Sequence, residues 1–152
     1  MEPRIRVPGV SGDSARAGLL RCPLEPAVED RNLILIADDE PYIVRALSFV
    51  LNKSGYQVCA ASDGEQALER IRADRPALVF LDIMMPRLDG YEVCRRIKSD
   101  PLLASTYVIM LTAKGQQADR AVGMAVGADE YITKPFSPTA VVKQVQRALG
   151  PR

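Results

Sequence analysis

Short, wholly apolar segments alternate along residues 32–150 with segments in which apolar side chains recur every three or four positions. Continuous runs such as Leu33–Ala37 and Leu78–Leu81 are typical of strands covered on both faces of a parallel sheet. The spacing of Ile43, Leu47 and Leu51 is that of a helix with one apolar face. The pattern therefore predicts β-strands that alternate with α-helices.

Five strands and five helices are expected. Their connections are short and helical, so the predicted fold class is α/β, a doubly wound parallel sheet with helices on both faces. Pro41, Asp63 and Ser137 are suited to helix starts, and Gly55 and Gly127 to helix ends. The expected strands are 33–37, 57–61, 78–81, 107–111 and 131–133, and the expected helices are 42–52, 63–72, 90–97, 116–126 and one that follows Ser137.

Residues 1–31 differ from the rest of the chain. They contain four prolines and three glycines, and no period of two or of 3.6 emerges. Such a segment buries too little apolar surface to offset the entropy lost on ordering. We therefore predict a disordered N-terminal extension before a single domain at 32–150, and a role as a partner-binding arm stays open.

Composition and charge narrow the function classes. Hydrophobic residues make up 47% and charged residues 26% of the chain, as in globular domains. Twenty basic and 19 acidic side chains give a formal charge of +1, so no overall basic field attracts nucleic acid or an anionic membrane. No apolar run is long enough to span a bilayer, and no signal peptide is evident. A cytoplasmic protein is expected.

The absence of histidine and the placement of the cysteines exclude several kinds of site. No histidine is present to act as a general base, a zinc ligand or a phosphodonor. Cys22, Cys59 and Cys94 form no CxxC pair. Cys59 and Cys94 are interpreted as small buried side chains in a reducing compartment.

Polar residues stand where four of the apolar strands end. Asp38 and Asp39 follow the first strand, Asp82 the third, Thr112 the fourth and Lys134 the fifth. The carboxyl ends of parallel strands share one edge, where doubly wound sheets bind their ligands. Singly, the acids could be helix caps or turn residues. Their joint order at four strand ends favours one functional site.

Three carboxylates crowded at one edge repel each other and need a cation. Oxygen ligands suit Mg²⁺. A neutralised Asp82 could then act as a nucleophile and form an acyl phosphate. Lys134 could hold the phosphoryl oxygens by charge, and Thr112 could donate its hydroxyl to them.

Four stretches of the chain carry a resemblance to a known family. ILIADDE, LVFLDIMMPRLDGYEV, VIMLTAKG and GADEYITKPF resemble, in order and spacing, the CheY-like receiver domains of two-component response regulators. The resemblance covers about residues 32–150 and implies the flavodoxin-like strand order 2-1-3-4-5. It also implies a phosphorylation-dependent signalling switch. Because the sequence ends shortly after the last expected helix, a stand-alone, single-domain type is expected, and a fragment of a longer regulator stays open.

The resemblance implies a role for each acid. Asp82 corresponds to the phosphoacceptor, and Asp39 to the acid that binds Mg²⁺ directly. Asp38 corresponds to the acid that orients metal-bound water, and Met84 stands where the family uses a main-chain carbonyl ligand.

The resemblance also implies the parts of a switch. Thr112 corresponds to the switch hydroxyl, Lys134 to the phosphate-binding lysine and Tyr131 to an aromatic side chain that turns inward with Thr112. The Lys134–Pro135 peptide matches a cis bond of the family. A half-buried Tyr131 without a signalling role stays open.

The implied partners are proteins. A sensor histidine kinase or a histidine phosphotransfer protein would supply the phosphoryl group, and a downstream protein would bind the activated domain. The expected helix 116–126 is apolar on more than one face, so Ala121 and Val122 are predicted to contact that partner. No direct contact with nucleic acid or membrane is expected, and a phosphorylation-dependent homodimer stays open.

The sequence argues against two other function classes. A phosphatase of the haloacid dehalogenase type needs an acid two residues after its nucleophile, where Met84 stands. A dinucleotide-binding domain needs a G-x-G-x-x-G motif after the first strand, and none occurs. We therefore expect that the chain is not an enzyme, except that it catalyses its own phosphorylation and dephosphorylation. The remaining alternative is a pseudo-receiver, an interaction module that is never phosphorylated.

Overall fold

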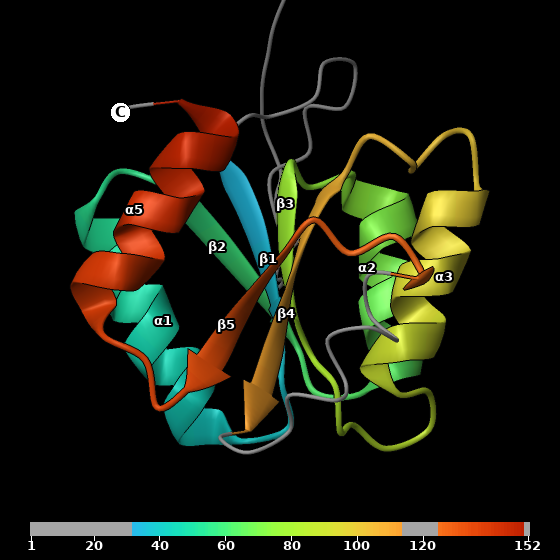
Figure 1. Ribbon diagram of the computed structural model, residues 1–152, viewed down its shortest axis with the longest axis horizontal. Helices are drawn as coiled ribbons and strands as arrows, with labels where there is room; N and C mark the ends of the chain where they lie inside the picture. Colours follow the sequence, from blue (N-terminus) through green and yellow to red (C-terminus); the bar gives the residue numbers. More distant parts are fainter. Residues whose placement is uncertain (1–31, 114–124, 151–152) are drawn as a thin grey trace, which may run out of the picture.

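The computed structural model describes residues 32–113 and 125–150, which form one parallel β-sheet with helices on both faces (Figure 1). The strand order is β2-β1-β3-β4-β5, and the α/β fold class and this order are as predicted. The strands are β1 (Leu33–Ala37), β2 (Gln57–Ala61), β3 (Leu78–Asp82), β4 (Tyr107–Ala113) and β5 (Glu130–Lys134).

Four helices lie in the described ranges. They are α1 (Pro41–Lys53), α2 (Gly64–Asp74), α3 (Gly90–Ser99) and α5 (Pro138–Leu149). The helix expected at 116–126 lies mostly outside the described residues, as do Ala121, Val122 and the extension 1–31. No helix in the described ranges combines the length and the apolar character that crossing a bilayer would require.

Each strand contributes to two separate cores because successive side chains point to opposite faces. In β1, Leu33 and Leu35 pack on the side of α2 and α3, whereas Ile34 and Ile36 pack on the side of α1 and α5. Figure 1 shows the same division, with α1 and α5 on one side of the sheet and α2 and α3 on the other. A fully apolar β1 is required because both faces are covered.

The helix starts mostly follow the predicted caps. Asp63 accepts a hydrogen bond from the Gln66 backbone N–H (2.8 Å), and Ser137 accepts one from the Ala140 N–H (3.0 Å). Helix α1 differs, because its N-cap is Glu40 and no side chain caps it. Asp38 and Asp39 are therefore not its N-cap residues, and the helix-cap alternative for this pair does not apply.

The two described cysteines are buried and unbridged, as predicted. Cys59 and Cys94 are 9% and 0% exposed. Burial raises the pKa of the Cys94 thiol to about 11, so it is neutral at physiological pH. A neutral thiol is a poor nucleophile, and Cys94 serves as a packing residue.

Candidate functional site

The parallel register brings the three predicted acids together at the carboxyl edge of the sheet. Ala37, the last residue of β1, pairs with Leu81 of β3, so Asp38 and Asp82 both follow at the same level. Carboxylate oxygens of Asp38, Asp39 and Asp82 all lie within 4.8 Å of one another. Asp38 and Asp82 are 1% and 7% exposed, whereas Asp39 is exposed. The predicted acidic cluster is therefore formed.

Backbone hydrogen bonds hold the loop 83–89 at its base and at its middle. The Gly90 N–H donates to the Ile83 carbonyl (2.9 Å), and the Gly64 N–H donates to the Pro86 carbonyl (3.3 Å). Met84, near the start of this loop, is 67% exposed. Met84 follows Asp82 by two residues, and its main-chain carbonyl as a ligand stays a prediction.

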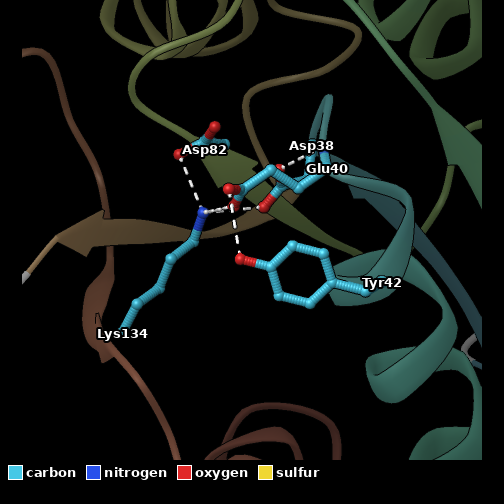
Figure 2. Close-up of polar contacts among 5 residues, drawn as sticks. All are labelled: Asp38, Glu40, Tyr42, Asp82 and Lys134. Atoms are coloured by element: carbon cyan, nitrogen blue, oxygen red, sulfur yellow. Dashed lines mark hydrogen bonds and ion pairs between the residues drawn. The ribbon is translucent and has the colours of Figure 1, made fainter.

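Lys134 provides the positive charge of the site (Figure 2). It is the last residue of β5 and pairs in register with Ala113 of β4. Its Nζ lies 3.0 Å from Asp38 Oδ2 and 3.3 Å from Asp82 Oδ1. The predicted lysine thus contacts two of the three predicted acids directly.

Glu40 is a site residue that the sequence did not reveal. Its Oε1 lies 3.1 Å from Lys134 Nζ, and its Oε2 accepts a hydrogen bond from the Tyr42 hydroxyl at 3.2 Å (Figure 2). Glu40 follows Asp38 and Asp39 directly, and this adjacency was the only available signal. Nothing in the spacing indicated that it would share Lys134.

Burial and mutual repulsion shift the ionisation of the site. Desolvation, helped by the negative charge of Asp38, raises the pKa of Asp82 to about 6. Desolvation also raises the pKa of Asp38, although the Glu40 N–H and Lys134 oppose it. Burial alone would lower the pKa of Lys134, but the surrounding carboxylates raise it well above its usual value. Lys134 is therefore always charged, and the acids repel each other.

Thr112 and Tyr131 lie on the two adjacent strands β4 and β5. Thr112 is 5% exposed. It lies two residues after Met110, which pairs in register with Tyr131. Tyr131 is 8% exposed and packs in the core on the side of α2 and α3, together with Met110. The ring of the predicted switch residue is thus turned inward.

The chemistry of the donor set fits a hard divalent cation. Three carboxylates converge, and oxygen is the ligand that Mg²⁺ prefers. Asp38 Oδ2 is buried and receives no hydrogen bond of good geometry from the described residues, although Lys134 Nζ lies near it as an ion pair. Burying an anionic oxygen without a hydrogen bond is costly, and a metal cation would lower that cost further than Lys134 alone. Asp38, Asp39 and Asp82 therefore have the composition and placement of a Mg²⁺ site.

The Lys134–Pro135 peptide bond is cis, as predicted. It lies between Lys134 and the loop that leads to α5.

Comparison with known proteins identifies similar domains. The family model described as "Response regulator receiver domain" matches residues 34–146. PhoP of Bacillus subtilis, an alkaline phosphatase synthesis transcriptional regulatory protein, is 46% identical over 116 residues, covering 76% of this chain and 48% of PhoP. A probable transcriptional regulator, ycf27 of Guillardia theta, is 45% identical over 129 residues, covering 85% of this chain and 49% of ycf27. The chain spans about half the length of these curated relatives.

Solved structures of a response regulator and of a receiver domain are also similar to this chain. A putative response regulator from Chloroflexus aurantiacus superposes with a TM-score of 0.75 at 36% identity, covering 78% of this chain and 97% of that one. The receiver domain of the sensor histidine kinase PA1611 from Pseudomonas aeruginosa gives a TM-score of 0.73 at 30% identity, covering 78% and 98%. That receiver domain was solved with a magnesium ion coordinated in its active site cleft.

Proposed function

The chain belongs to the response regulator receiver domain family, and from this premise we propose that it is a phosphorylation-dependent switch of a two-component phosphorelay. In this proposal Asp82 accepts the phosphoryl group from a phosphohistidine of a sensor histidine kinase or of a histidine phosphotransfer protein. The observation that carries the proposal is the position of Asp82. Its carboxylate lies within 4.8 Å of those of Asp38 and Asp39 and 3.3 Å from the Lys134 ammonium, at the carboxyl edge of the sheet.

The proposed reaction is a phosphoryl transfer to a carboxylate. An oxygen of Asp82 bonds to phosphorus while the P–N bond of the donor's phosphohistidine breaks, and the electron pair of that bond leaves with the imidazole. Lys134 stabilises the charge of the phosphoryl oxygens, and Thr112 donates its hydroxyl to one of them. The nucleophile must be ionised, and an Asp82 pKa of about 6 leaves it mostly ionised at neutral pH.

Mg²⁺ is the proposed cofactor. Asp38, Asp39, Asp82 and the Met84 main-chain carbonyl would hold it, and it would supply the positive charge that lets an anionic donor approach the acids. The convergence of three carboxylates supports this assignment. The magnesium ion in the similar PA1611 receiver domain supports it independently.

The proposed output is contact with another protein. Phosphorylation would shift an equilibrium between two states of Thr112 and Tyr131, and only by its differential affinity for those states. The curated relatives are named as transcriptional regulators, which supports a downstream role in gene regulation. We propose no reaction on other substrates and no direct contact of this domain with nucleic acid.

The experiment that tests the proposal is an intact mass measurement after incubation with Mg²⁺ and acetyl phosphate. We expect a gain of one phosphoryl group, which is absent in Asp82→Asn and in a sample without metal. No gain in a folded wild-type protein would contradict the proposal and would favour the pseudo-receiver alternative.

A further inference from the structure

Lys134 divides its charge among three carboxylates, and one of them has no part in the proposed chemistry. Its Nζ lies 3.0 Å from Asp38 Oδ2, 3.1 Å from Glu40 Oε1 and 3.3 Å from Asp82 Oδ1. An ammonium group has three N–H donors. The contacts to Glu40 and Asp82 are hydrogen bonds, whereas Asp38 Oδ2 is an ion-pair partner without good hydrogen-bond geometry. A phosphoryl oxygen that binds Lys134 therefore competes with these carboxylates.

The three partners of Lys134 differ in burial. The side chains of Asp38 and Asp82 are 0% and 10% exposed, whereas that of Glu40 is 43% exposed. Separating a buried carboxylate from its cation leaves an uncompensated charge, whereas an exposed carboxylate regains water. Of the three carboxylates, Glu40 therefore separates from Lys134 with the smallest loss of free energy.

Glu40 is nevertheless held against Lys134. Its Oε2 accepts the hydrogen bond from the Tyr42 hydroxyl at 3.2 Å, and its backbone N–H donates to Asp38 Oδ1 at 2.9 Å. Figure 2 shows the Glu40 carboxylate between the Tyr42 hydroxyl and the Lys134 ammonium. These contacts fix both the backbone and the carboxylate of Glu40 in front of the lysine.

We infer that Glu40, oriented by Tyr42, is a positioning residue that competes with the incoming phosphoryl group for Lys134 and so slows phosphorylation of Asp82. The inference rests on the proposed function. A carboxylate at this place also repels the phosphoryl oxygens, so it opposes the phosphorylated state as well as the approach to it. The opposite role, in which Glu40 aligns Lys134 for transfer, predicts an effect of opposite sign.

The first measurement is the rate of mass gain with Mg²⁺ and acetyl phosphate. Glu40→Gln is expected to react about two to five times faster than the wild type, because it loses one partly exposed ion pair. Tyr42→Phe keeps the formal charge and frees Glu40 on one side, so a smaller rise is expected. Glu69→Gln, an exposed substitution on α2 away from the site, removes the same charge and is the matched control with no change expected.

The second measurement is an equilibrium one. Beryllofluoride is an anionic mimic of a phosphoryl group, and its apparent dissociation constant should fall in Glu40→Gln by a factor similar to the rise in rate. Both measurements are made at low and at high salt, because a distant charge effect is screened while a direct contact is screened much less.

The outcomes separate this inference from the proposed function. A wild-type protein that gains no phosphoryl group contradicts the proposed function itself. A phosphorylated wild type with an equal or slower Glu40→Gln overturns the competing role of Glu40. A rise in Glu40→Gln that vanishes at high salt, with Tyr42→Phe unchanged, overturns it too, because general repulsion then explains the effect.

Discussion

Asp82 is a carboxylate whose surroundings favour its neutral form. Burial and the charge of Asp38 raise its pKa from 3.8 to about 6, although Lys134 contributes in the opposite direction. A carboxyl whose pKa is raised in the folded state contributes stability below pH 3.8, and this contribution is lost as the pH rises through about 6. At neutral pH the ionised Asp82 therefore destabilises the metal-free fold.

This cost predicts that Asp82→Asn is more stable than the wild type without metal. The rise in pKa from 3.8 to about 6 corresponds to about 3 kcal/mol at pH 7.5, an upper limit because Lys134 also loses one partner. Urea unfolding in EDTA at pH 7.5 measures the difference, which should shrink below pH 4. A wild type that is more stable than Asp82→Asn at pH 7.5 would show that the Lys134 contact outweighs burial.

At the scale of elements, the site depends on how closely α3 approaches the end of β3. A Cβ added to Gly90, the first residue of α3, would lie 2.5 Å from the Asp82 carbonyl oxygen and 2.9 Å from Ile83 Cα. Both neighbours are backbone atoms, so no side chain can move aside. Gly90 thus allows the helix to begin directly against the backbone that carries Asp82.

Gly90→Ala is therefore expected to destabilise the fold by about 1–3 kcal/mol, although alanine is the better helix former. The strand end must shift, so Mg²⁺ binding should weaken at the same time. Urea unfolding and Mg²⁺ titration measure the two effects. Ser99→Ala, an exposed substitution at the last residue of α3, is the control. If Gly90→Ala were as stable as the wild type, the backbone at Asp82 and Ile83 would have to shift without a loss of stability.

At the scale of the whole molecule, the sheet separates two cores, and the candidate site lies at the carboxyl edge of the sheet. This arrangement could be predicted, since apolar strands with polar ends are visible along the chain and parallel strands end at one edge. The cluster of Asp38, Asp39 and Asp82 followed from the same rule. The pairing of Glu40 with Lys134 could not, because it depends on the reach of two long side chains from distant elements. The close approach at Gly90 likewise depends on the packing of α3 on β3.

Only the folded state brings Asp82 next to Asp38 and Asp39, so Mg²⁺ should stabilise the whole domain. A ligand that binds only the folded state adds about 1.4 kcal/mol at ten times its dissociation constant. Asp39 is exposed, so Asp39→Asn should keep near wild-type stability in EDTA but lose most of the gain with Mg²⁺. Urea unfolding with and without Mg²⁺ measures both, with Glu69→Gln as the control that keeps the gain. An equal gain in Asp39→Asn would place the cation elsewhere, because an amide at this position removes one of the three charges that the proposed site supplies.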